Sequence, residues 1–306
     1  MSTWDQLSPL HYWSIGVGSV IGGDFFGWQP VLTGGIGHAF VAFGIVAVLY
    51  GILAYCITLL SSRCDHGGAY IFVSQGIGPR FGVVVACMET MKLFLVLCAL
   101  GFGLVGYLHA IVNISNYFQY IVYFVLISVF CALSSKGVSF SGNVQMYITS
   151  ACLLVLCFYW LSMLTKVDFV ANAAPDHTYF YTYADCIRAF PFAAWFFLGF
   201  EELPLLPSAD PSSPSLSRGM VASYVTVAAS GLLTMILSAA GRPGIDGDID
   251  TEPAPLSSGI HHIYSYPMSI VFDIMSILAL LCPFYSFILY CAHHLHTSAK
   301  VGILPT

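Results

Sequence analysis

The chain has 306 residues, of which 58% are hydrophobic and only 8% are charged, and its formal net charge is −6. Soluble domains carry about 25% charged residues, so this composition excludes an ordinary soluble protein and indicates an integral membrane protein. The nine Lys and Arg residues are scattered, which argues against a nucleic-acid partner. Residues 1–10 contain no basic residue and no apolar core, so we expect no signal peptide.

Eight apolar stretches are long enough to cross about 30 Å of hydrocarbon. In chain order, the sequence predicts helices at 11–36, 39–62, 82–112, 117–134, 144–165, 187–207, 218–240 and 267–297. An even number of crossings places both termini on the same side of the membrane. The ten cysteines lie mostly inside these stretches and form no CxxC pair, so we interpret them as small packing residues.

The distribution of charge between the connecting segments predicts the orientation. If the termini are cytoplasmic, five basic residues lie in inner segments (Arg63, Arg80, Lys136, Arg218 and Lys300). Three lie outside (Lys166, Arg188 and Arg242). The acidic residues at 246–252 and a glycosylation sequon at 113–115 would then face outward. We therefore expect a multi-pass plasma-membrane protein with a cytoplasmic N-terminus.

Two of the predicted spans contain residues that are costly in a membrane helix. The first reads GVGSVIGGDFFGW at 16–28, with five glycines and Asp24, and a charge at mid-depth costs about 2.5–3.5 kcal/mol. The sixth reads FPFAAWFFLGFEELPLLP at 190–207, where Glu201 and Glu202 follow Gly199.

The two unusual spans begin five spans apart. Interrupted helices at corresponding positions of two halves are typical of inverted-repeat transporters, whose binding site lies where the breaks meet. The alternative is that the glycines serve only close helix packing. Packing glycines need no neighbouring acid, so the pattern favours a polar binding site.

Several motifs resemble the amino acid–polyamine–organocation (APC) transporter superfamily, most closely its ethanolamine permease-like branch. They occur in register along the chain: VIGGDFFGW at 20–28, DHGGAYIFVSQGIGPRFG at 65–82, GYLHAIV at 106–112, PFAAWFFLGFEELPL at 191–205, Ser-Arg-Gly at 217–219 and SAKVGILP at 298–305. The chain departs from the family pattern at Thr58, at Cys64 and at His293 and His294.

The resemblance implies an all-α membrane fold of two inverted five-helix repeats, with the first and sixth helices broken. The whole chain, 1–306, would form one transmembrane domain, with a first repeat at 11–165 and a partial second repeat at 187–297. Such transporters usually have about twelve helices and this chain has about eight. We therefore expect an incomplete second repeat, and either a missing C-terminal segment or an oligomeric partner.

By position, the resemblance implies a substrate site formed at the two breaks. The first break would comprise Ile21, Gly22, Gly23 and Asp24, and the sixth Leu198, Gly199, Phe200 and Glu201, with Phe25 and Trp195 as aromatic walls. A small cationic amine needs a carboxylate, backbone carbonyls and an aromatic face. We expect Asp24 to hold the amine, the alternative being that its carboxylate is tied to backbone N–H groups of the sixth helix.

Other polar residues in the spans permit more than one interpretation. Glu89 and Lys92 are spaced for an ion pair along one helix, the alternative being that Glu89 acts in coupling. Glu201 would either carry a coupling proton or brace the break, whereas Glu202 would face another side. Asp273, near the outer end of the last helix, is expected to reach water.

We expect no cofactor and no metal, and the sequence leaves coupling to H⁺ or Na⁺ open. The fifth span contains no Lys or Arg, so no positively charged side chain there could take the place of a bound Na⁺. Thr149 and Ser286 are candidate oxygen ligands for that ion. The histidines at 293, 294 and 296 are predicted to form a solvated interfacial cluster that is remote from His261 and His262.

The sequence thus predicts a secondary transporter that moves a small amine or amino acid by alternating access. The alternative is a transporter-derived fragment, or a sensor that binds substrate without flux. An intramembrane enzyme is disfavoured, because Asp24 and Glu201 lie outside the sequence contexts of aspartyl dyads. The expected partners are the small substrate and the lipid bilayer.

Overall fold

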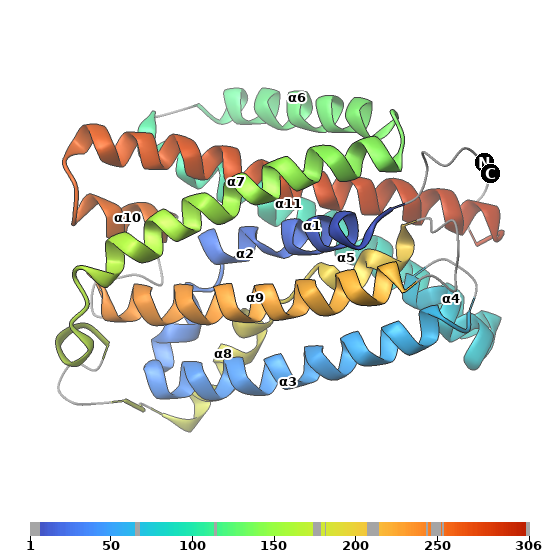
Figure 1. The fold of residues 1–306 in the computed structure, drawn as a ribbon, viewed down its shortest axis with the longest axis horizontal. Coiled ribbons are helices and arrows are strands. Elements are labelled where there is room, and N and C mark those ends of the chain that lie inside the picture. The colour runs from blue at the N-terminus through green and yellow to red at the C-terminus, as the bar shows by residue number, and fades with distance from the viewer. Residues whose placement is uncertain are drawn as a thin grey trace.

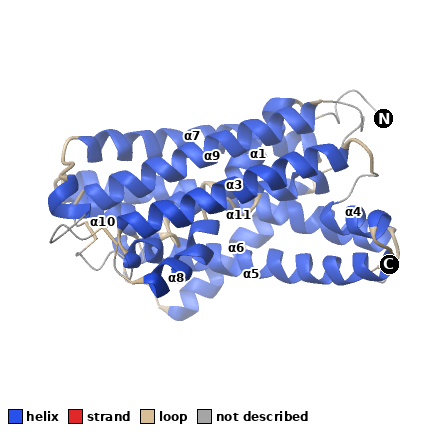
Figure 2. Cartoon of the chain, turned by 90° about the horizontal axis from the view of Figure 1, so that it is seen from below, coloured by secondary structure: helices blue, strands red, loops and turns tan. Residues whose placement is uncertain are grey.

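The computed structural model describes residues 7–64, 68–112, 115–173, 179–180, 182–206, 214–242, 244–245, 252 and 254–303. The first residues of the 65–82 motif, most of the sequon and most of the acidic residues at 246–252 lie outside the described residues. The described part is helical and contains no strand (Figure 2).

Within the described residues, six helices are long and apolar enough to cross a membrane, which confirms an all-α membrane fold. They are α3 (Ile36–Ser61), α5 (Pro79–Ile111), α6 (Asn116–Ser134), α7 (Val138–Leu164), α9 (Ser215–Ala240) and α11 (Tyr266–Lys300). Each covers one of the predicted spans, with ends displaced by up to six residues. The displacement arises because helical hydrogen bonding extends beyond the apolar run that marks a span in the sequence.

The other two predicted spans are interrupted. The first consists of α1 (Pro9–Val20), α2 (Gly22–Phe25) and the 3₁₀ helix η2 (Gln29–Gly34). The sixth consists of α8 (Tyr183–Ala194) and the 3₁₀ helix η5 (Phe200–Leu205). Neither contains an unbroken helix long enough to cross the membrane.

Three shorter helical elements were not predicted, because they are too short to stand out as spans. They are α4 (Gly68–Gly76), the π-helical turn η3 (Phe169–Ala173) and α10 (Pro255–His261). Of these, α4 packs against α5 and η5, while α10 packs against α7 and α11. They cover the two ends of the bundle rather than crossing it (Figure 1).

Helix α1 lies at the centre of the bundle, where it contacts α7, α9, α11 and η5 (Figure 1). It begins directly after Ser8, whose hydroxyl accepts the His11 backbone N–H, and Pro9 occupies its first turn. The start of α1 and the end of α11 lie at the same end of the bundle (Figure 1).

The outer faces of the bundle are apolar. Only 6% of the α6 span is buried within the protein, against 67% of the α11 span. Large exposed side chains such as Phe102 and Phe124 project from α5 and α6. Apolar side chains on outer faces, with hydrogen-bonded backbone inside each helix, are what lipid requires of a spanning protein. The chain is therefore a multi-pass integral membrane protein.

Candidate substrate site at the two helix breaks

The first interrupted span stays helical further than its glycines suggest. The Ile21 N–H donates to Val17 O at 2.8 Å, and the Asp24 N–H donates to Ile21 O at 3.1 Å. The chain leaves the helix only at Phe26, whose φ and ψ are −161° and 167°, and it turns at Gly27 with φ +89°. The turn thus lies just after Ile21, Gly22, Gly23 and Asp24, the positions that the resemblance implied for the break.

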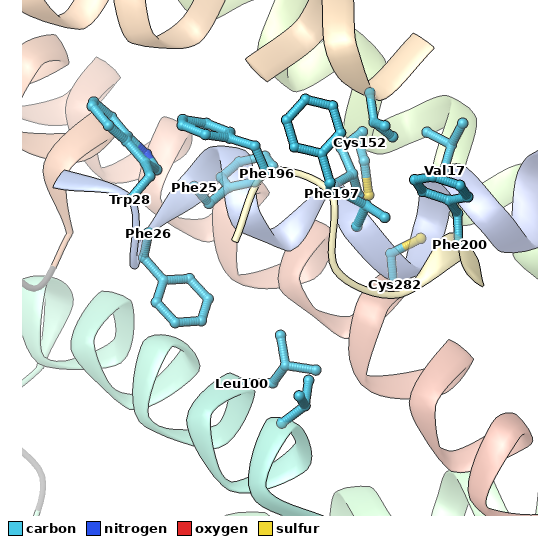
Figure 3. Close-up of a cluster of buried hydrophobic side chains, with 14 of the residues drawn as sticks. Val17, Phe25, Phe26, Trp28, Leu100, Cys152, Phe196, Phe197, Phe200 and Cys282 are labelled. Carbon is cyan, nitrogen blue, oxygen red and sulfur yellow. The ribbon is translucent and has the colours of Figure 1, made fainter. Parts of the chain in front are cut away.

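Side chains from outside α2 satisfy the carbonyls that this turn frees. The Tyr107 hydroxyl donates to Phe25 O at 2.9 Å, and the Trp28 indole N–H donates to Asp24 O at 3.1 Å. Phe26 points toward α5, where its ring lies against Gly103, while Trp28 lies beside Phe196 at 5.7 Å between ring centroids (Figure 3). The turn is therefore fixed in place rather than loose.

Trp195 gives two of the five glycines a specific purpose. A Cβ on Gly23 would lie 2.6 Å from Trp195 O, and a Cβ on Gly27 would lie 2.6 Å from the indole Nε1. Any side chain at either position would collide with Trp195. The remaining three glycines, at 16, 18 and 22, give close approach to η5, α7, α9 and α11, as the packing interpretation predicted for all five.

The sixth span unwinds between Trp195 and Gly199. This stretch overlaps the break implied by the resemblance at 198–201 only at Leu198 and Gly199, because Phe200 already begins η5. Gly199 has φ +134°, a conformation that L side chains rarely adopt. The Glu201 carboxylate accepts the Gly199 backbone N–H at 2.7 Å and so braces the turn. No backbone hydrogen bond to the carbonyls of Trp195 or Leu198 occurs among the described residues, which leaves these oxygens available to a ligand.

The two breaks meet around one small cavity. It is lined by Ser19, Val20 and Gly23 of the first span, Trp195 and Leu198 of the sixth, and Val96, Leu100 and Phe287. Its volume is about 10 Å³, which is space for about one water molecule. The structure is therefore closed around this cavity, and a ligand larger than water fits only when the surrounding helices move apart.

The cavity is closed by two sets of contacts, one on each side of it along the axis of α5. Val96 and Leu100 line it, and Gly103, one turn further along α5, receives the Phe26 ring, which packs edge-on against Trp195 at 5.8 Å. One turn before Val96, Lys92 forms ion pairs with the sixth span. At about 1.5 Å per residue, the two closures are roughly 16 Å apart along the helix.

Lys92 contacts both acids of the sixth span. Its Nζ lies 3.4 Å from Glu201 Oε1 and forms a second, closer ion pair with Glu202 Oε1. The predicted separation of Glu201 and Glu202 is therefore wrong, because the 3₁₀ turn directs both carboxylates to the same lysine. Lys92 pairs across to η5 rather than along its own helix to Glu89.

Asp24 is buried at 3% exposure, and its carboxylate is within hydrogen-bonding reach of the Ser230 hydroxyl on α9. Its Oδ2 atom has no partner among the described residues. Asp24 directly follows the cavity-lining Gly23, and its carboxylate faces Ser230 on α9. Asp24 thus has its neighbour on α9, whereas Glu201 pairs with Lys92 on α5.

Other polar residues lie in surroundings different from those predicted. His294 is 1% exposed rather than solvated, with Nε2 2.8 Å from Thr90 Oγ1 on α5. Asp273 is fully buried, with Oδ2 3.2 Å from His261 Nε2 of α10. In both cases a neighbouring helix covers a position that the sequence alone placed at the membrane surface.

The two candidate Na⁺ ligands are already engaged by the protein. Thr149 Oγ1 donates to Ser14 O at 2.8 Å, and Ser286 accepts the Gln145 amide at 2.7 Å. The same amide donates to Cys282 O at 3.1 Å, which ties α7 to α11. The Gln145 amide thus lies between α7 and α11, where a cation bound to Thr149 and Ser286 would have to lie.

Sequence reasoning did not identify several cavity residues. Ser19, Val96, Leu100 and Phe287 line the space, and Phe26 closes it, although none lies in a distinctive pattern. Gly103 could have indicated that α5 packs closely against the first break, because a glycine opposite a large aromatic side chain, here Phe26, marks a close approach. That pairing becomes visible only when α5 and the first break are placed together.

Two interrupted helices thus face each other across a closed cavity inside an apolar bundle. The chain belongs to the amino acid permease family, whose sequence profile matches residues 7–305. This confirms the resemblance to the APC superfamily.

A curated relative was also found. The chain is 23% identical over 255 residues to a protein of Rhizobium meliloti (strain 1021) described as an uncharacterized transporter. The match covers 78% of this chain and 53% of the relative, so the chain spans about half the length of the curated relative it matches.

Proposed function

We propose that this chain is a secondary transporter for a small amino acid or amine, which it moves across the membrane by alternating access. The observation that carries the proposal is the cavity between the breaks of the first and sixth spans. Membership of the amino acid permease family supports the substrate class. The apolar outer faces support a lipid bilayer as the surroundings, and we propose a plasma-membrane location with a cytoplasmic N-terminus.

The unpaired groups at the cavity support an amine-bearing substrate. The free carbonyls of Trp195 and Leu198 can accept hydrogen bonds from an ammonium group, and the Trp195 ring offers a cation–π face. Asp24 Oδ2 is buried without a partner, and a buried carboxylate oxygen is costly until a cation or proton reaches it. We propose that opening of the bundle brings Asp24 within reach of the substrate amine.

The two closures support alternating access. The Phe26–Trp195 contact closes the cavity on one side, and the Lys92 ion pairs with Glu201 and Glu202 close it on the other. In this proposal one closure opens while the other holds. Glu201, which braces Gly199, would transmit the state of the Lys92 pairs to the break.

The test is exchange of labelled alanine or ethanolamine by the purified chain in lipid vesicles. We expect counterflow, and we expect Trp195→Leu to weaken the apparent affinity by about tenfold, the value of one cation–π contact of about 1.4 kcal/mol. Trp160→Leu is the matched control, because Trp160 is similarly half-buried but its indole bonds Thr234 away from the cavity.

Two further results would decide against parts of the proposal. Unchanged affinity of Asp24→Asn for either labelled compound would remove Asp24 from the site. Binding of alanine or ethanolamine without any counterflow would contradict transport and favour a binding sensor.

A further inference from the structure

A buried acid–histidine pair lies on the Lys92 side of the cavity, outside its lining. Glu89 Oε2 on α5 and His294 Nδ1 on α11 are 3.6 Å apart, and the two side chains are 9% and 1% exposed. Neither atom has a hydrogen-bond partner among the described residues. Two buried atoms with lone pairs therefore face each other, 3.6 Å apart.

The other contacts of His294 fix its tautomer. Nε2 lies 2.8 Å from Thr90 Oγ1 and 3.2 Å from Ala86 O. The Thr90 hydroxyl donates its own proton to Ala86 O at 2.8 Å, and a carbonyl oxygen can only accept. We therefore assign the ring proton to Nε2, which leaves Nδ1 with a bare lone pair unless the ring carries a second proton.

Glu89 also needs a proton or a cation. Its carboxyl group accepts the Ala69 N–H at the start of α4, but Oε2 lies opposite His294 and has no hydrogen-bond partner among the described residues. Lys92 cannot neutralise it alone, because Lys92 already pairs with both Glu201 and Glu202. An ionised Glu89 beside a bare Nδ1 would leave a buried charge uncompensated.

Among the described residues, the other groups around the pair do not supply that charge. From α4, the Tyr70 ring packs edge-on against the His294 ring at 5.2 Å. On α11 itself, His293 is partly exposed and His296 is exposed. From η5, the nearest charged groups are the two carboxylates bound to Lys92.

We propose that Glu89 and His294 together form a proton-binding site, with one proton held between Glu89 Oε2 and His294 Nδ1. When the proton is bound, the pair is either a carboxylic acid beside a neutral imidazole or a carboxylate beside an imidazolium. When it leaves for water, a further negative charge appears next to Lys92. That charge competes with Glu201 for Lys92, and Glu201 braces the Gly199 turn.

A link from this proton to substrate movement rests on the proposed function above, whereas the proton site itself does not. The site lies outside the cavity, so a proton and a substrate can be bound at the same time. Lys92 is the contact through which one would affect the other.

The proton site is tested by NMR of ¹⁵N-histidine-labelled full-length chain in lipid vesicles between about pH 5 and about pH 8. The His294 signals are assigned by their loss in His294→Gln. We expect Nε2 to stay protonated throughout, and we expect the Nδ1 signal to change with pH. In Glu89→Gln, whose amide can donate to Nδ1, we expect a single neutral tautomer that does not respond to pH.

His296→Gln is the matched control, because His296 lies on the same helix but is exposed, and its removal should leave the His294 signals unchanged. A bare Nε2 in the wild-type chain would overturn the proposal. So would an Nδ1 signal with the same pH response in wild type and in Glu89→Gln.

The link to transport has a separate readout, which is the ratio of alanine accumulation driven by a pH gradient to alanine exchange without one. We expect Glu89→Gln to lower this ratio by about tenfold, a coupling of about 1.4 kcal/mol, and we expect His296→Gln to preserve it. Absence of exchange in the wild-type chain would contradict the proposed function, while the NMR result would still decide the proton site. An unchanged ratio would show that the site does not drive transport.

Discussion

Gly23 and Gly27 lie against Trp195, and this contact brings the two interrupted spans together. The Trp195 carbonyl and indole occupy the volumes that side chains at these two positions would need. Gly23 and Gly27 therefore matter mainly because they have no side chain, which leaves room for Trp195. Gly27 additionally adopts a positive φ.

We predict that Gly23→Ala destabilises the closed state by about 1–3 kcal/mol, the usual cost of forcing a methyl group into a packed site. The added Cβ would meet Trp195 O, which is backbone and cannot rotate away. Thermal unfolding of the detergent-solubilised chain measures the effect.

Gly44→Ala is the matched control, because Gly44 lies inside α3 and a methyl group added there would have no neighbour within 4 Å. An alanine there should leave stability unchanged or raise it slightly, since Ala is the better helix former. Equal melting temperatures for the two variants would contradict the close approach of Gly23 to Trp195.

The elements around the cavity are joined by charge as well as by packing. Lys92 on α5 pairs with Glu201 and Glu202 on η5, and Glu202 is only 2% exposed. The sixth span could not hold two adjacent acids at this depth without the lysine. The position of η5 relative to α5 is therefore set by an ion-pair cluster that no single stretch of sequence contains.

We predict that Lys92→Met destabilises the chain by about 3–5 kcal/mol, because it leaves buried carboxylates without their cation. Adding Glu202→Gln should restore much of the loss by removing one of those charges. Thermal unfolding again measures both variants.

Arg188→Met serves as the control. Arg188 pairs with Asp185 on an exposed part of α8, where its side chain is 76% exposed, so its loss should have no measurable effect. If Lys92→Met were as harmless as Arg188→Met, the buried ion-pair cluster would not stabilise the break.

The whole molecule is an apolar bundle, and about half of its charged residues lie in the segments that connect the helices. The start of α1 and the end of α11 lie at the same end (Figure 1), as an even number of crossings requires. The division into two inverted repeats, 11–165 and 187–297, stays a prediction, as does the side of the membrane that each end faces.

We predict that two introduced cysteines are labelled from opposite sides of the membrane, in a chain whose native cysteines are replaced by serine or alanine. Lys136→Cys, between α6 and α7, should react with an impermeant maleimide only after the cells are permeabilised. Lys166→Cys, just after α7, should react in intact cells, because positive-inside asymmetry places it outside. The reverse pattern would mean that the N-terminus is not cytoplasmic.

The membrane class, six uninterrupted spans and the location of two interrupted ones were predictable from the sequence. Long apolar runs and the cost of Asp24, Glu201 and Glu202 in lipid report directly on the solvent around each segment. The exact point of the first break was not predictable, since the Ile21 and Asp24 N–H groups keep helical hydrogen bonds and the turn comes at Phe26.

The partners of the buried polar groups were likewise decided by the tertiary structure. Glu201 and Glu202 share Lys92, His294 faces Glu89, and Asp273 faces His261. A sequence by itself determines what each residue must avoid, such as a lone charge in lipid, because that cost depends on the residue and its surroundings alone. It does not determine which distant residue relieves the cost, because that depends on how the helices rotate and cross, which only their packing together fixes.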